Sequence, residues 1–248
     1  ELRERVAGAG LEGSCPSVSG GFSAAMGIQV DTKDCTSLGD AELAEMADLC
    51  ADGPSGYEIG FLSKAAEAWV LVSMARDGNP LKGFSFCTLE RIGGTPSVLI
   101  GLASIKRTSK RDAVLRAIMA DQMRRALMAF PDEDVLVGMR VNDVSGFNAL
   151  ANLSDIIPRP EHRASGEERA WGARLAKRFG VETGDYDDRS FIAKGDKSFP
   201  PVLDHETLQP EKIEPAFNEF LAPLNHKRGD SLVIAGWALA ENLEKLAR

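Results

Sequence analysis

The sequence predicts a mixed α/β fold, in which a largely antiparallel sheet is flanked by helices and a helical segment is appended at the C-terminus. Three apolar runs separated by two turn sequences indicate an antiparallel meander between residues 68 and 105. A long amphipathic helix is expected next, over residues 111–130, and a short apolar strand follows it at residues 134–141. This order is not the strict strand–helix alternation of a doubly wound fold, so a mixed sheet is predicted.

Length and charge favour one elaborated domain and exclude some partners. The chain has 248 residues, of which 44% are hydrophobic and 27% are charged, an ordinary balance for a protein with a sizeable core. Its formal net charge is -8, whereas nucleic-acid binding depends on cations that neutralise phosphates. No apolar run approaches the roughly 20 residues of a membrane span, and no signal-peptide pattern opens the chain. We therefore expect no nucleic-acid partner, no membrane partner and a cytoplasmic location.

The chain lacks the short motifs of several common sites. Its four cysteines have unrelated spacings without a CxxC pair, and its three histidines are far apart without an HExxH pattern, so we expect no metal site. Free thiols in a reducing compartment are expected instead. The absence of GxSxG, GxGxxG and Walker sequences argues against a serine-hydrolase elbow, a dinucleotide site and an ATP site.

The elements before the long helix follow from local patterns. We expect a loose Gly- and Ser-rich arm over residues 1–21, a strand over 22–30, helices over 37–51 and 55–68, and strands over roughly 68–75, 82–90 and 97–105. In the first helix, apolar residues recur at i, i+3, i+4 and i+7 from Leu43 to Cys50, and Ser37 or Asp40 is the expected N-cap. The turns "RDGNP" and "RIGGTP" contain the glycine and proline that separate meander strands.

The elements after the long helix are predicted in the same way. We expect a strand over residues 134–141, a helix over 142–153 capped by Asn142 or Asp143, a helix over 166–180 ended by Gly180, and a strand over 189–195. The main domain is placed at residues 22–204. Residues 205–248 are expected to form a helical extension that packs on this domain or on a partner subunit. Within the extension, residues 231–247 fit either a strand followed by a helix or one helix.

Five consecutive polar residues, "RTSKR", stand where the third meander strand meets the long helix. Ser109 and Asp112 have the spacing of a capping box, which predicts a helix start near Lys110. The first N–H groups of a helix are unpaired and carry the positive end of its dipole. With Arg107, Lys110 and Arg111 around them, they would form an anion site suited to a phosphate or pyrophosphate. A solvated charged turn remains the alternative.

The order of elements over about residues 22–193 resembles the GNAT superfamily of acyl-CoA-dependent N-acyltransferases. In that family a loop between a long strand and a long helix binds the pyrophosphate of coenzyme A through an Arg/Gln-x-x-Gly-x-Gly/Ala pattern. Arg107 stands at the first position of this pattern, and Lys110 and Asp112 stand at its two glycine positions. Asn142 matches the asparagine that often begins the family's next helix. Because the glycines are replaced, side chains of the turn would do more of the binding.

The resemblance implies transfer of an acetyl or other acyl group from acyl-CoA to an amine, by direct attack on the thioester. A splay between two strands would hold the acyl carbonyl through a backbone N–H. The acceptor would be a small-molecule amine, a protein N-terminus or a lysine. Glu90 would take a proton from the amine, or else it is a strand-end glutamate at a turn. The implied cofactor-binding residues are Ala103, Ser104, Ile105, Arg107, Thr108, Ser109, Lys110, Arg111, Asp112 and Asn142.

Other functions remain open from the sequence. The family often places a tyrosine on the later helix as general acid, but the only tyrosines here are Tyr57 and Tyr186. The chain would then be a catalytically inactive GNAT-like domain that binds coenzyme A, another ligand or a protein. A further alternative is a mixed α/β domain that binds another phosphorylated metabolite at the same turn. The apolar stretch 232–247 also suggests a homodimer contact.

Overall fold

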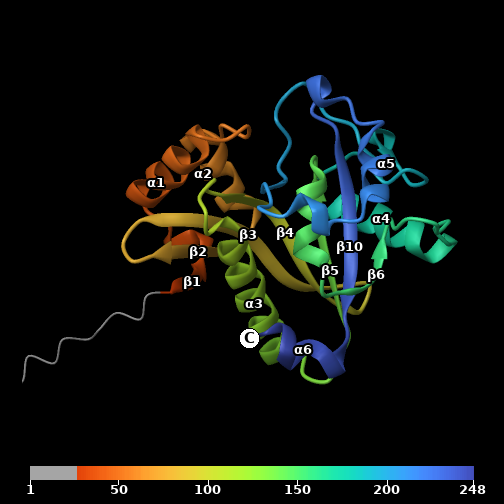
Figure 1. The fold of residues 1–248 in the computed structure, drawn as a ribbon, viewed down its shortest axis with the longest axis horizontal. Helices are drawn as coiled ribbons and strands as arrows, with labels where there is room; N and C mark the ends of the chain where they lie inside the picture. Colours follow the sequence, from red (N-terminus) through yellow and green to blue (C-terminus); the bar gives the residue numbers. More distant parts are fainter. Residues whose placement is uncertain (1–26) are drawn as a thin grey trace, which may run out of the picture.

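The computed structural model describes residues 27–248, so the predicted arm at 1–21 and the start of the strand predicted from Phe22 lie outside the described residues. The described strands form one sheet in the order β1-β2-β3-β4-β5-β10-β8-β7, with β6 beside β10 and β9 beside β4 (Figure 1). The strands are β1 Ile28–Asp34, β2 Leu71–Asp77, β3 Leu81–Ile92, β4 Thr95–Ile105, β5 Val135–Val141, β6 Ser154–Ile157, β7 Tyr186–Asp187, β8 Ile192–Ala193, β9 Leu203–Asp204 and β10 Ser231–Ala238. The α-helices are α1 Asp40–Ala51, α2 Ile59–Ala68, α3 Arg111–Ala129, α4 Gly166–Arg178, α5 Asn218–Leu221 and α6 Ala240–Leu246.

The predicted mixed α/β fold and its antiparallel meander are confirmed. Strands β2, β3 and β4 pair antiparallel in sequence order. Gly78 and Gly93 have φ of 69° and 59° in the two turns, a conformation that glycine adopts without steric cost. Helix α3 then crosses one face of the sheet and returns the chain to β5, which runs parallel to β4.

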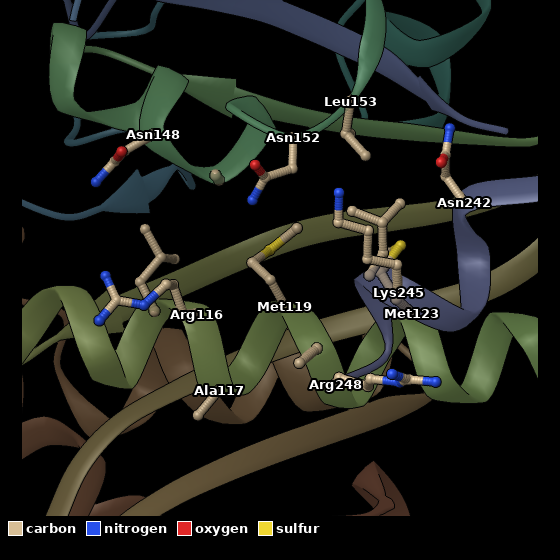
Figure 2. A pocket seen from close by; sticks show the side chains of 14 residues that line it. Arg116, Ala117, Met119, Met123, Asn148, Asn152, Leu153, Asn242, Lys245 and Arg248 are labelled. Carbon is tan, nitrogen blue, oxygen red and sulfur yellow. The ribbon is translucent and has the colours of Figure 1, made fainter. Parts of the chain in front are cut away.

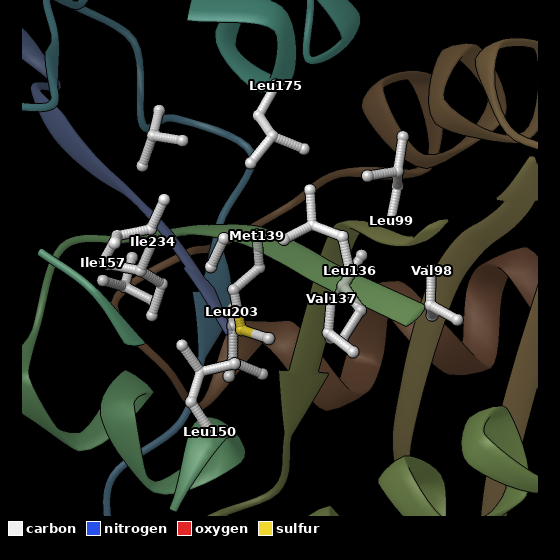
Figure 3. Close-up of a cluster of buried hydrophobic side chains, with 14 of the residues drawn as sticks. Val98, Leu99, Leu136, Val137, Met139, Leu150, Ile157, Leu175, Leu203 and Ile234 are labelled. Atoms are coloured by element: carbon white, nitrogen blue, oxygen red, sulfur yellow. The ribbon is translucent and has the colours of Figure 1, made fainter. Parts of the chain in front are cut away.

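Helices cover both faces of the sheet. On one face, Leu62 of α2 packs with Phe84 and Phe86 of β3. Helix α4 lies on this same face, because its Arg178 stacks on Trp69, which packs in the same cluster as Leu62, and its Leu175 fills the space above Gly138 of β5. Figure 3 shows Leu175 and Leu150 approaching the strands from opposite sides. Helices α3 and α6 therefore share the other face with the turn that contains Leu150 (Figure 1).

The prediction of a helical C-terminal segment is wrong for residues 231–238. They form β10, whose residues 232–238 pair antiparallel with residues 141–135 of β5. The strand is buried along most of its length, with β5 on one side and β6 and β8 on the other. An apolar run of this length fits a helix or a strand. It forms a strand here because the backbone groups on the free edge of β5 need hydrogen-bond partners. The strand-then-helix alternative for residues 231–247 is the correct one.

Several predicted boundaries also change. Residues 142–153 do not form an α-helix but a 3-10 helix, η2 (Val144–Leu150), in which the Asp143 carboxylate accepts the Ser145 N–H at 2.8 Å. Helix α1 is capped at Gly39, whose N–H donates to the Glu42 carboxylate, and not at Ser37 or Asp40. The strand predicted over residues 189–195 is limited to β8. Before β10, the helical extension predicted from residue 205 contains only 3-10 turns and the short α5.

The structure also bears on the expected free cysteines and on the expected lack of a membrane span, for the residues that it describes. Cys35, Cys50 and Cys87 are buried free thiols, as predicted, and Cys15 lies outside the described residues. No helix within residues 27–248 has the length and apolar character needed to cross a membrane.

Candidate functional site

Strands β4 and β5 separate at the end of their parallel ladder. The ladder joins residues 97–100 of β4 to residues 136–139 of β5, while β4 continues to Ile105. At the same point the register between β3 and β4 shifts, which leaves Gly101 as the extra residue of a β-bulge. The two strands thus form the splay in which the sequence resemblance places acyl-CoA.

The chain itself fills this splay with residues 202–208, hereafter the closing segment. Ala103 of β4 donates its N–H to the Val202 carbonyl at 3.1 Å, and β9 continues the pairing with Leu203 opposite Ala103. Figure 3 shows Leu203 beside Met139 of β5. The closing segment therefore acts as an extra parallel strand on the edge of β4 that β5 has left.

The two arginines of the "RTSKR" turn bind the closing segment. The Arg107 Nη2 atom lies 2.7 Å from Asp204 Oδ1, and its Nε lies 3.3 Å from Glu206 Oε2. Arg111 Nε donates to the Glu206 carbonyl at 2.5 Å. The Asp204 side chain is only 4% exposed, so its pairing with Arg107 is shielded from water.

Asp112 binds the same segment from the first turn of α3. Its carboxylate accepts the Leu208 N–H at 3.1 Å and the Thr207 hydroxyl at 3.2 Å. The predicted capping box between Ser109 and Asp112 is therefore wrong. Lys110 is the N-cap of α3 and its N–H donates to the Thr108 hydroxyl. The Asp112 carboxylate instead binds residues about 95 positions later in the sequence, where it accepts from a buried hydroxyl and from a backbone N–H of the closing segment.

His205 is the most buried titratable group of the closing segment. Its Nε2 lies 3.1 Å from Asp112 Oδ1, but the alignment does not make a hydrogen bond, and both ring nitrogens are buried without a hydrogen-bond partner among residues 27–248. Burial lowers the pKa of His205 below its ordinary value, and the nearby Asp112 carboxylate offsets this only in part. The imidazole is therefore held neutral at pH 7.

Other predicted site residues are divided between the splay and distant positions. Ala103, Ser104 and Ile105 are buried along the half of β4 that contacts the closing segment. Exposed Ser109 lies in the turn, and Lys110 extends to Asp77 of β2, with Nζ 2.6 Å from the carboxylate. Asn142 follows the last residue of β5.

Glu90 lies away from these residues. It pairs with Ser97 at the opposite end of β4 from the turn, about 26 Å away at the usual rise per strand residue. Its carboxylate accepts the Arg178 Nε–H of α4 at 2.6 Å. The structure thus gives Glu90 a cationic partner and no position beside the splay.

Two features that keep the splay closed were not predicted from the sequence. Tyr57 donates its hydroxyl to the Pro200 carbonyl at 2.8 Å and accepts the Val202 N–H at 3.2 Å, and burial raises its pKa. The second feature is the closing segment, whose "DHE" run contains two acids close to a histidine. That run is the only local signal for it, since its partners are about 95 residues away in sequence.

Arg140 of β5 is a buried cation on the α4 side of the sheet. It is 6% exposed, its Nε donates to the Ser231 hydroxyl at 2.8 Å, and no ion pair joins it to an acid in the described part of the chain. Burial lowers its pKa to about 10.

The residues present do not fit an acyl-CoA in this arrangement of the chain. The backbone of β4 that would meet the cofactor is already paired with the closing segment. The carboxylates of Asp204 and Glu206 stand against Arg107, where a pyrophosphate would need to bind, and would repel it. Among residues 27–248, no group of three or more His, Cys, Asp or Glu side chains is placed to hold a metal ion.

Comparison with solved structures finds similarity to N-acetyltransferases at low identity. The ribosomal-protein-S18-alanine N-acetyltransferase from Escherichia coli matches with a TM-score of 0.41 and 7% identity, over 85% of this chain and 95% of that one. The IAA acetyltransferase from Bacillus cereus matches with a TM-score of 0.42 and 8% identity, over 85% and 99%. The aminoglycoside 6'-N-acetyltransferase from Enterococcus faecium has a TM-score of 0.34 and 13% identity, over 45% of this chain and only 62% of that protein's length. No family model matches the chain, and no curated protein matches it in sequence.

The GNAT-like fold is nevertheless visible in the topology itself. A long strand, β4, leads through a polar turn into a long helix, α3, and then into the parallel strand β5 that diverges from it. This is the order of elements that the sequence resemblance predicted. The departure from that resemblance is the closing segment between the two strands.

Proposed function

We propose that this GNAT-like chain is a binding module and not an acyltransferase. One observation supports this above all others: residues 202–208 pair with β4 in the splay, where the family resemblance places acyl-CoA. A cofactor that uses the same strand edge and the same arginines has to displace them. The protein would bind its ligand or protein partner on a surface outside the closed splay.

The bonding of the closing segment supports a permanent closure. Its backbone pairs with β4, its acids bind Arg107, and Asp112 binds its far end through Thr207 and Leu208. Opening the segment would break these contacts together, at a net cost of about 0.5–1.5 kcal/mol for each neutral hydrogen bond and about 1.5–3 kcal/mol for each one to a charged group.

The catalytic groups that acyl transfer would use also lack suitable positions. Burial raises the pKa values of Tyr57 and Tyr186, and the Tyr57 hydroxyl is hydrogen-bonded to Pro200 and to Val202 of the closing segment. Glu90 is bound by Arg178 at the other end of β4. Glu90 is therefore not placed to take a proton from an amine in the splay, and the Tyr57 hydroxyl is already used in hydrogen bonds of the chain.

Calorimetric titration of acetyl-CoA into the purified chain tests the proposal. We expect no binding stronger than a Kd of about 1 mM, the weak end of specific affinities. Binding in the micromolar range, together with thiol release in the presence of amines, would refute it.

An acyltransferase gated by the closing segment is the second candidate. It is favoured by Arg107 and Arg111, which present cations to this cleft and are neutralised by Glu206, a side chain that is 58% exposed. In a variant with Asp204→Lys and Glu206→Lys, the segment would be repelled from both arginines. The matched control carries Glu58→Lys and Glu67→Lys, the same charge change at two exposed acids on and before α2.

The double variant distinguishes the two candidates. If acetyl-CoA binds the Asp204/Glu206 variant and not the wild type or the control, a gated transferase replaces the binding module. If none of the three proteins binds acetyl-CoA, the binding module stands.

A further inference from the structure

A cavity lies outside the closed splay, between the middle of α3, the end of η2 and α6 (Figure 2). It has a volume of about 600 Å³, within the usual range of small-molecule sites. Its walls come from three segments that are far apart in sequence but packed together, since α6 lies directly against α3. We refer to it as the α3–α6 pocket.

The floor of the α3–α6 pocket is apolar. Leu115 and Met123 of α3 are buried at its base, and Met119 lies between them on the same face of the helix. Leu153 and Leu246 complete the floor from the other two segments. Methionine side chains are flexible and polarisable, so this floor can adapt to apolar groups of different shape.

The rim of the pocket is cationic. Arg116, Lys245 and Arg248 line it, and no aspartate or glutamate among residues 27–248 does, although the whole chain has a net charge of -8. None of these three cations forms an ion pair within residues 27–248, whereas Arg124 and Arg125 on the same helix are both bound by Asp121. Figure 2 shows the Lys245 amino group extending across the pocket toward the η2 side.

Three asparagines add neutral hydrogen-bonding groups to the same rim. Asn148 donates to the Thr207 hydroxyl of the closing segment at 3.3 Å. The side chains of Asn152 and Asn242 form no hydrogen bond in the described part of the chain. A ligand carboxylate could therefore accept from a cation and an amide together, and charge-assisted hydrogen bonds of this kind are the stronger ones.

We propose that the α3–α6 pocket binds a small organic anion with an apolar body, of the class of medium-chain monocarboxylates. The apolar body would lie on the methionine floor and the carboxylate would meet Lys245 and Arg116. A cationic amphiphile would meet Arg116 and Lys245, which have no acidic partner within residues 27–248, so the pocket selects by charge as well as by apolar area. The site shares none of its cations with the closed splay, so the inference goes beyond the proposed function.

Calorimetric titration with decanoate and with decylamine, which differ in the sign of their head group, tests the proposal. We expect decanoate to bind with 1:1 stoichiometry and decylamine not to bind. Lys245→Glu and Arg116→Glu should each weaken decanoate binding about tenfold or more, as expected for loss of a charged hydrogen bond. Lys64→Glu, the same change at an exposed lysine of α2 on the opposite face, should leave the affinity within about twofold, as expected for a distant exposed charge.

Met119→Trp fills the floor of the pocket and should abolish decanoate binding, with circular dichroism used to check that the variant is folded. Equal binding of decanoate and decylamine, or equal loss of affinity in Lys64→Glu and Lys245→Glu, would overturn the proposal. Displacement of decanoate by acetyl-CoA would also overturn it, because the anion would then belong to the splay. Failure to bind decanoate leaves the acetyl-CoA result of the proposed function unaffected.

Discussion

The Arg107 guanidinium and the Asp204 carboxylate lie 2.7 Å apart, although 97 positions separate them in sequence. Arg107 is the residue that the sequence resemblance assigns to pyrophosphate binding. In the structure its partner is an acid of the same chain, and that acid belongs to the segment that closes the β4–β5 splay. Arg107 in the polar turn therefore helps to hold the closing segment in the splay.

Asp204→Ala is expected to lower the free energy of unfolding by about 1.5–3 kcal/mol, the usual worth of a buried hydrogen bond to a charged group. Glu206→Ala is the matched control, because Glu206 also contacts Arg107 but is 58% exposed, and a cost under about 1 kcal/mol is expected for it. Urea unfolding at pH 7 measures both. Equal costs for the two variants would mean that the buried ion pair does not hold the closing segment.

Acidification is expected to weaken the closing segment through His205. Burial lowers the pKa of His205 in the folded chain, whereas an unfolded histidine titrates near 6.5. Because the unfolded chain then takes up the proton first, stability that is present above about pH 6.5 is lost as the pH falls below it. Asp112, Arg111 and Arg107 are the charged groups that influence this histidine.

The measurement is urea unfolding of the wild type and His205→Gln at pH 7.5 and pH 5. The wild type should lose more stability than His205→Gln over this interval. His226→Gln, at an exposed histidine, should behave as the wild type does. Identical losses in the wild type and His205→Gln would show that the His205 imidazole does not contribute to the pH dependence.

Arg140→Met is expected to raise stability. Arg140 is buried with Ser231 as its hydrogen-bond partner, and replacing a buried charge by an apolar side chain of similar length is often stabilising by about 1–4 kcal/mol. The pKa of Arg140 in the folded chain, about 10, lies below that of unfolded arginine, so the cost of burial is fully present below pH 10. The gain should therefore be the same at pH 6 and pH 8.

Thermal unfolding checks this, with a rise of about 2–4 °C for each kcal/mol in a chain of this size. Arg124→Met, at a side chain that is 53% exposed, is the control and should change little. A lower melting temperature for Arg140→Met would mean that the guanidinium is stabilised by more than its bond to Ser231.

Gly101→Ala is expected to destabilise the β4 bulge. A Cβ at this position would overlap the ring of Trp69, which also packs against Phe179 and under Arg178. Overpacking of this kind costs about 1–3 kcal/mol. Gly60→Ala in α2 is the matched control, since a Cβ there meets nothing within 4 Å and alanine favours a helix by up to about 1 kcal/mol.

Thermal unfolding should therefore show a lower melting temperature for Gly101→Ala and an unchanged or higher one for Gly60→Ala. If both glycine variants behave alike, Trp69 moves aside without cost and the bulge does not require glycine.

The sequence by itself determined the elements whose signals are local. The meander from β2 to β4, helix α3 and strand β5 follow from apolar periodicity and from turn glycines such as Gly78 and Gly93. The polar turn between β4 and α3 was also placed correctly, because Arg107 and Arg111 are fixed by the strand before them and the helix after them.

Only the tertiary structure decided which distant segments pair. Residues 231–238 carry an apolar run that fits a strand or a helix, and the open edge of β5 makes it the strand β10. The closing segment has no apolar periodicity that predicts a strand. Its residues 203–204 form β9 because β4 offers unpaired backbone groups and Arg107 offers a cation. Strand pairing and buried ion pairs join positions that are far apart in sequence, so no local stretch of sequence reveals them. In this protein such contacts between the closing segment, β4 and Arg107 close the cleft.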